Sequence, residues 1–347
     1  YGADALRFTL LTGGTPGNDV KLSTTRLEAN RNFANKMWNA ARFVLSNLGD
    51  HDLSLTTEKS GNPHLTYALP NLASLSLADR WILSRFESLA SEVTRLVEGW
   101  QLGEAGRQLY DFMWGDYCDW YIEAAKVSVN EGTPDQAQAT RQVLAYVLEQ
   151  SLRLLHPFMP MVTEAIWQNL PQIGGNLQDA DKALMTRSWP QPTGLLNSAA
   201  DETFARIQEI VRTVRNARSE YNVEPGKRIA AQISAGEHAP ALAANRAVLA
   251  SLARLDSASL DIRDELPAPA QAVTLAVSGV TIYLPLAGMV DLEAEKKRLQ
   301  KEIENLEKQI QRISGMLNNP GYVNKAPAEL VEKERVRLVE FQAKHQQ

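Results

Sequence analysis

The sequence contains a single cysteine, Cys118, and no apolar run that approaches the roughly 18 residues of a membrane span. One cysteine excludes a disulfide framework within the chain and any zinc ribbon built on paired cysteines, which fits a reducing cytosol. The lack of a long apolar run argues against a membrane protein. The chain also lacks an initiating methionine, because it begins at Tyr1 in a helical pattern with no export signal. We therefore expect a fragment of a longer protein.

The 347 residues are 44% hydrophobic, which is ample for two or three domains with their own cores. The net charge is −5, from 36 bases and 41 acids. This acidic average hides a basic element between positions 20 and 45, where a single acid, Glu28, is outnumbered by bases. These bases are Lys21, Arg26, Arg31, Lys36 and Arg42.

The segment 19–48 has two faces when it is read at the helical period of 3.6 residues. One face is an apolar stripe for a core, made by Phe33, Met37, Ala40, Ala41, Val44 and Leu48. The second face lies about 120° around the helix and carries Asn32, Lys36, Asn39 and Phe43. Amides, an ammonium and an aromatic ring are the groups that read single-stranded RNA. Two other interpretations stay open: the polar groups form an ordinary solvated face, or the ring packs on a neighbouring helix.

Helical patterns also occur at 1–12, 76–100, 104–129, 140–155 and 158–170. The segment 50–76 shows no sustained hydrophobic period and is predicted to be a loop. We expect 76–100, which begins with a capping signal from Ser76 to Asp79, to be the antiparallel partner of the first long helix. An aromatic stripe on 104–129 is typical of bundle core, and consists of Tyr110, Trp114, Tyr117, Cys118, Tyr121 and Ala125. The pattern up to Leu196 predicts an antiparallel helix bundle.

Carboxylates on the surface of 104–129 raise the question of catalysis. Asp116, Asp119 and Glu123 could form a general acid and base pair, but no histidine or metal-ligand pattern accompanies them, and such groups are usually solvated. We therefore predict no catalytic residue and no metal site in the chain.

A mixed pattern follows from 197 to 288 and predicts a small α+β module. It comprises helices at 201–221 and 241–255 and short strands at 228–233, 260–262, 272–277 and 281–286, the last two joined by a hairpin at Ser278 and Gly279. The first of these helices carries four arginines, which suit either RNA contact or a solvated face. They are Arg206, Arg212, Arg215 and Arg218.

The last segment, 289–347, predicts an antiparallel coiled-coil hairpin. Apolar residues alternate four and three apart from Leu299 to Leu317, a break follows at 318–321, and 327–345 is helical again. The bases on the outward positions of the first helix suit a phosphate backbone. They are Lys297, Arg298, Lys301, Lys308 and Arg312. A coiled coil that is solvated on both sides is the alternative.

Several stretches resemble the valyl-tRNA synthetase family in the region that follows its catalytic core. They are YGADALRF, TPGNDVKL, EANRNFANKMWNAARFVL, YDFMWGDYCDWYIEAAK and NNPGYVNKAPAELVEKE. The resemblance implies a mostly α chain in three parts. Residues 1–196 would be the anticodon-binding bundle, with 1–18 as the junction to a catalytic core, 197–288 a connecting module, and 289–347 a coiled-coil arm that binds the outer corner of the tRNA.

The same resemblance implies which residues contact the anticodon loop. Lys21, Lys36 and Phe43 would come first, with Phe43 stacking on a base, and the other candidates are Arg26, Arg31, Asn39, Arg42 and Ile122. The parent enzyme would attach valine to tRNA(Val) with ATP and Mg²⁺. The HIGH and KMSKS motifs of that chemistry are missing from these residues, so we expect a chain that catalyses nothing alone and needs no cofactor itself. The resemblance also implies a monomer that binds tRNA and works with catalytic and editing domains. The alternatives are an isoleucyl-tRNA synthetase, or a helical scaffold without RNA whose coiled coil recruits a protein.

Overall fold

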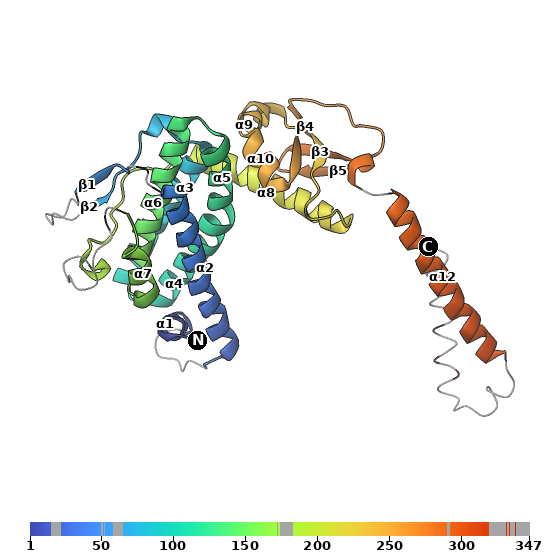
Figure 1. Ribbon diagram of the computed structural model, residues 1–347, viewed down its shortest axis with the longest axis horizontal. Coiled ribbons are helices and arrows are strands. Elements are labelled where there is room, and N and C mark those ends of the chain that lie inside the picture. The colour runs from blue at the N-terminus through green and yellow to red at the C-terminus, as the bar shows by residue number, and fades with distance from the viewer. Residues whose placement is uncertain are drawn as a thin grey trace.

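A computed structural model describes residues 1–14, 22–49, 51, 53–57, 65–171, 173, 183–289, 292–318, 331, 333 and 337. The chain is mostly helical with a small sheet, as predicted. Figure 1 shows a helix bundle beside a smaller module that contains the sheet, and a long helix that extends away from that module. None of the described helices combines the length and the apolarity needed to cross a bilayer.

Among the described residues, seven α-helices make the bundle. They are α1 (Ala3–Thr12), α2 (Thr24–Leu48), α3 (Leu77–Glu98), α4 (Leu102–Asp111), α5 (Ile122–Glu131), α6 (Pro134–Leu155) and α7 (Pro160–Trp167), with 3₁₀ turns at Leu72–Ser74 and Leu184–Thr186. The apolar stripe of α2 is confirmed, because all six of its members are buried. The predicted partner of α2 is wrong. The helix packs on α1, α6 and the segment between α4 and α5, whereas α3 packs on α4, α6 and α8 (Ser198–Glu220).

The predicted helix at 104–129 is helical throughout but not uniform. Between α4 and α5 the residues Phe112–Tyr121 form wide π-helical turns. Each wide turn adds a residue and shifts the face that meets the core, so Phe112, Met113 and Trp120 are buried as well. Of the predicted stripe, Tyr117, Tyr121 and Ala125 are buried, whereas Tyr110, Trp114 and Cys118 are half-buried.

The segment 50–76 is not simply a loop. It contains two three-residue antiparallel strands, β1 (Leu55–Thr57) and β2 (Leu65–Tyr67). The side chain of Gln142 on α6 fixes them by accepting from the Ser54 amide at 2.9 Å and donating to the carbonyls of Ser54 and Ala68 at 2.8 Å each. Strands of three residues are too short to show an alternating pattern in the sequence.

The ends of α3 and α6 follow from their caps. The predicted capping box of α3 is present, and the fully buried Asp79 also accepts from the hydroxyls of Tyr121 at 2.7 Å and Thr140 at 2.9 Å. Burial raises the pKa of Asp79. Helix α6 starts at Pro134, earlier than predicted, because Thr133 and Gln136 form a second capping box. It ends at Leu155 before Pro157, as predicted.

The module after α8 is a four-stranded sheet with helices. Its elements are β3 (Ile229–Ser234), a 3₁₀ turn (Gly236–His238), α9 (Ala239–Ala244), α10 (Arg246–Ala253), β4 (Leu255–Arg263), β5 (Ala272–Val277), β6 (Val280–Pro285) and α11 (Leu286–Met289). The strand order is β4-β3-β6-β5, with β3 and β4 parallel and the other pairs antiparallel. The predicted hairpin is confirmed, with positive φ at Ser278 and Gly279. The predicted helix at 241–255 is two helices that break at Asn245, and β4 starts before the predicted strand.

The arginines of α8 are more than a solvated face. Arg215 donates to the Leu252 carbonyl at 2.9 Å, and Arg218 donates to the Lys227 carbonyl at 2.7 Å. The guanidinium groups of Arg212 and Arg215 lie 5.2 and 5.4 Å from the centre of the Trp120 ring in the bundle. These side chains therefore join α8 to its own module and to the bundle.

The long helix is α12 (Leu292–Leu317), which extends from the sheet module in Figure 1. Its 26 residues span about 39 Å at 1.5 Å per residue, which agrees with the predicted rod. Ile313 on the predicted seam is buried and Ile303 is exposed. Of the predicted returning helix at 327–345 only Val331, Lys333 and Arg337 are described, and they are helical. The rest of that helix lies outside the described residues, so the hairpin stays a prediction.

Candidate nucleic-acid interface

The surface of α2 that faces away from the core is rich in amides and guanidinium groups. Arg31, Asn32, Asn35, Asn39 and Arg42 are all exposed there. At 100° per residue they occupy one continuous arc of about 100°. Amide and guanidinium groups bind base edges and phosphates, so this arc has the chemistry of an RNA-binding face.

Lys36 lies at the edge of this arc, where α2 meets the π-helical segment. Its ammonium is 4.0 Å from the centre of the Trp114 ring and forms an ion pair with Asp119. The lysine side chain is 25% exposed and the carboxylate 50% exposed. Trp114 in turn stacks on Tyr110, with ring centres 5.6 Å apart and an angle of 15° between the planes. An ammonium, an aromatic face and a carboxylate are therefore gathered at one point.

Phe43 has a similar environment two turns further along α2. It is half-buried and packs against the core, and the Lys126 ammonium of α5 lies 5.2 Å from the centre of its ring. Lys126 pairs with Glu123 at 2.6 Å. The ring neither stands free in solvent nor lies fully inside the core. The seam between α2 and residues 112–131 thus repeats one unit, in which a lysine covers a ring and a carboxylate holds the lysine.

The remaining anticodon-loop candidates separate into three groups. Arg26 and Arg31 contact the N-terminal segment of the chain. Arg26 donates to the Gly13 carbonyl at 3.1 Å, and the guanidinium of Arg31 lies 5.8 Å from the centre of the Tyr1 ring. Both arginines therefore lie toward the N-terminal end of α2. Ile122 is only 5% exposed and packs in the core, which leaves it no surface for RNA. The structure therefore contradicts its assignment as a contact. Lys21 lies outside the described residues.

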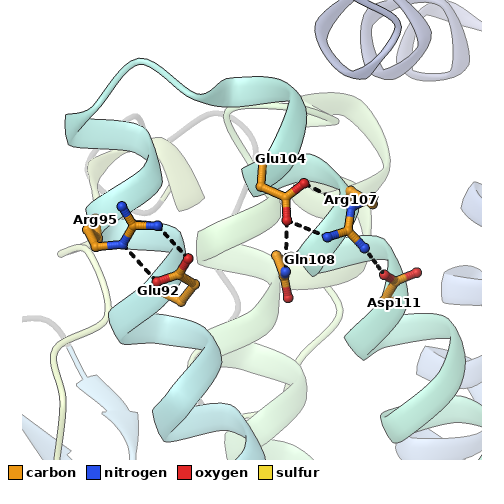
Figure 2. Close-up of polar contacts among 6 residues, drawn as sticks. All are labelled: Glu92, Arg95, Glu104, Arg107, Gln108 and Asp111. Atoms are coloured by element: carbon orange, nitrogen blue, oxygen red, sulfur yellow. Dashed lines mark hydrogen bonds and ion pairs between the residues drawn. The ribbon is translucent and has the colours of Figure 1, made fainter.

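The face made by α3 and α4 has the opposite character. Figure 2 shows Arg95 turned toward Glu92, and Arg107 turned toward Glu104 and Asp111. The nitrogen–oxygen distance is 2.7 Å in the first pair and 2.9 Å in each of the other two. Each arginine is neutralised by acids of its own helix. A cavity between the two helices also has the carboxylates of Glu92, Asp111 and Asp116 in its lining. Acidic and internally paired charges do not favour a phosphate backbone, so the α2 face is the better candidate.

Comparison with known proteins bears on this arrangement. Residues 79–233 match the family described as the anticodon-binding domain of tRNA ligase, and residues 291–347 match the valyl tRNA synthetase tRNA binding arm. The valine–tRNA ligase of Geobacillus stearothermophilus is 42% identical over 98% of the chain, and that of Bacillus subtilis is 39% identical over 99%. The chain belongs to the valyl-tRNA synthetase family. It covers 37% of the length of each of these two relatives and corresponds to their C-terminal part.

The three carboxylates that raised the question of catalysis each have a basic partner. Asp116 pairs with Arg85 at 3.0 Å, Asp119 with Lys36, and Glu123 with Lys126, so the three carboxylates form no acid and base pair. Burial raises the pKa of Asp116. No group of three His, Cys, Asp or Glu side chains suited to a metal ion occurs among the described residues.

The sequence did not reveal several side chains that lie at this candidate interface. Trp38 lies on α2 itself, while Trp114 and Lys126 contact Lys36 and Phe43 of α2. The sequence analysis proposed none of the three as an RNA contact. Trp114 was expected in the core because it follows the helical stripe, but the π-helical turns rotate it to a half-buried position. Lys126 lies over the Phe43 ring only in the folded chain, and no local spacing pairs residues so far apart in the sequence.

On α12, Lys308 and Arg312 are exposed and line a cavity together with Gln309, Ile313 and Arg337. The two bases lie four residues apart, so they share one face of the helix. Lys297, Arg298 and Lys301 belong to the same helix, but their side chains lie outside the described part of the chain.

Proposed function

We propose that the chain is the tRNA-binding C-terminal part of a valine–tRNA ligase. It orients tRNA(Val), as a monomer in the cytoplasm, so that catalytic and editing domains can attach valine using ATP and Mg²⁺. The chain itself supplies none of that chemistry, because neither HIGH nor KMSKS occurs in it. The observation that carries the proposal is the pair of cation–π contacts along α2, Lys36 over Trp114 and Lys126 over Phe43. Aromatic rings suit stacked bases, and ammonium groups beside them suit the phosphates.

In this proposal the three parts divide the work. Residues 1–196 hold the anticodon loop on the α2 face through Lys36, Asn39, Arg42 and Phe43, with Lys21, Arg26 and Arg31 toward its N-terminal end. Residues 197–288 connect this bundle to residues 289–347, a coiled-coil hairpin whose outer face meets the corner of the tRNA. A filter-binding titration of the 347-residue chain with tRNA(Val) and tRNA(Ile) transcripts tests the proposal. Equal affinities would favour a related synthetase, and no affinity for either RNA would favour a scaffold that recruits a protein.

We expect Asp119→Asn to tighten tRNA binding about threefold. A half-exposed ion pair is worth up to about 1 kcal/mol, and a phosphate that captures Lys36 must break the pair with Asp119. The substitution removes both the competitor and a repelling charge. The measurement is the dissociation constant at low salt, with Asp111→Asn as the matched control, because Asp111 pairs with Arg107 on the acidic α3–α4 face. Weaker binding by the Asp119 variant would mean that the pair positions Lys36 for the RNA.

The double variant Lys308→Gln/Arg312→Gln is expected to reduce the salt dependence of binding by about two counterions without changing the preference for the cognate anticodon. Each phosphate contact releases roughly one counterion. The logarithm of the dissociation constant would be followed between about 50 and 200 mM salt. The matched control, Arg95→Gln/Arg107→Gln, removes two cations that acids already neutralise and should leave the slope unchanged. An unchanged slope for the α12 variant would remove these two residues from the interface.

A further inference from the structure

A cavity of about 300 Å³ opens between α2 and α7, on the flank of α2 away from Phe43. It is lined by Trp38, Ala41, Arg42, Leu45, Ile166 and Asn169. Ala41 and Ile166 are buried, whereas the indole of Trp38 is 41% exposed. The cavity therefore has an apolar lining, an accessible aromatic ring and polar groups from α2 and from the turn that follows α7. Its volume lies at the lower limit for small-molecule sites, which suits one ring system and not an extended ligand.

The polar groups at this cavity are available for a ligand. Within the described residues, the Trp38 indole N–H and the Arg42 guanidinium have no hydrogen-bond or ion-pair partner. The amide nitrogen of Asn169 donates to the Ala165 carbonyl at 2.8 Å, which orients its oxygen as an acceptor. On the opposite flank, by contrast, Lys36 and Lys126 are held by carboxylates. Arg42 is thus a cation of this face that a phosphate can take without displacing an acid.

The walls of the cavity are held in place before any ligand arrives. The carboxylate of Asp4 in α1 accepts from the amides of Met161 and Val162 at 3.2 and 2.6 Å and so caps the first turn of α7. The other wall is α2, whose apolar stripe is buried. Because the cavity is preformed, few side chains need to become ordered when a ligand binds, so little conformational entropy is lost.

We propose that this cavity binds one unstacked nucleobase of the RNA, with the ring against Trp38, the base edge at Asn169 and the flanking phosphate on Arg42. The inference rests on the proposed function, since it adds a second base site to the same α2 face. Trp38 and Phe43 are five residues apart, which places them about 140° apart around the helix. Two bases of a splayed loop would therefore lie on either side of α2, with the backbone crossing the exposed asparagines between them.

The test places 2-aminopurine at successive positions of the anticodon loop of tRNA(Val) and records its fluorescence on the 347-residue chain. We expect one position to be quenched by the wild-type chain and not by Trp38→Leu, which should also bind the RNA about tenfold more weakly. Trp38→Phe should restore most of the quenching, because it keeps a ring. Arg42→Gln should reduce the salt slope by about one counterion. Trp100→Leu, which removes the indole that is 80% exposed, is the control and should change nothing.

The outcomes separate this inference from the proposed function. If the wild-type chain binds tRNA and responds to Phe43 substitution, while Trp38→Leu changes neither affinity nor quenching, the nucleobase site is wrong and the proposed function stands. If the wild-type chain binds no tRNA at all, both are wrong. A loss of affinity in Trp38→Leu that Trp38→Phe does not restore would also overturn the site, because it would reflect packing and not stacking.

Discussion

Replacing Phe43 by leucine weakens the binding of tRNA(Val) by roughly 5- to 150-fold. This expectation follows from the proposed stacking of a base on the ring, since each stacked base contributes about 1 to 3 kcal/mol. Leucine is the informative replacement because Phe43 is half-buried against the core, and leucine keeps the apolar contact while removing the aromatic face. The measurement is the dissociation constant of the 347-residue chain for tRNA(Val) transcripts, with circular dichroism to confirm the fold.

The same variant should lose discrimination as well as affinity. If the ring stacks on an anticodon base, transcripts with substituted anticodons should bind the leucine variant nearly as well as the cognate transcript does. Phe43→Tyr keeps an aromatic face and serves as the matched control that retains both properties. An equal loss of affinity for cognate and substituted transcripts would argue against base reading at this position. It would leave Lys126, which lies over the ring, as a general phosphate contact.

Periodicity was most informative where a helix turns one face to the core. The stripe from Phe33 to Leu48 was predicted in full, because burial of one side of a regular helix imposes a 3.6-residue pattern on the sequence. The capping box of Ser76 and Asp79 and the hairpin at Ser278 and Gly279 were predicted for a similar reason. In each case the residues that define the feature are close together in the chain and have only one geometry that satisfies them.

Other features depend on tertiary contacts between residues far apart in the sequence, which no short sequence pattern indicates. The π-helical turns at Phe112–Tyr121 preserve an apolar pattern while rotating its phase, so the sequence could not indicate which aromatic rings reach the surface. The choice of α6 instead of α3 as a neighbour of α2 depends on how several similar stripes fit together. Within the candidate site, the exposed side chains of α2 could be predicted, whereas Lys126 over Phe43 and the cavity beside Trp38 depend on tertiary packing. Ile122 was assigned from resemblance alone, and its burial shows the limit of that route.

The largest effect on stability is expected from Arg153→Met, which should reduce the free energy of unfolding by about 3 to 5 kcal/mol. Arg153 lies on α6 and pairs with Glu149 one turn earlier, with Nε 2.7 Å from the carboxylate, and both side chains are almost entirely buried. The same carboxylate accepts from the Thr66 hydroxyl at 2.6 Å, which ties β2 to α6. Without the guanidinium, a buried carboxylate is left with neutral donors only. Urea denaturation followed by circular dichroism would measure the loss.

The double variant Glu149→Gln/Arg153→Met distinguishes this cause from lost packing. A buried charge without its partner is far more unfavourable than a neutral amide, so the double variant should regain most of the stability lost in Arg153→Met, and the two effects should not be additive. The carbonyl of Ser188, which accepts from Arg153 at 3.1 Å, loses a donor in both variants and cancels in the comparison. Additive losses would mean that the aliphatic stem of Arg153, and not its charge, holds α6 against the segment around Ser188. Since α2 packs on α6, a variant loosened in this way should also bind tRNA more weakly, whereas the restored double variant should bind it normally.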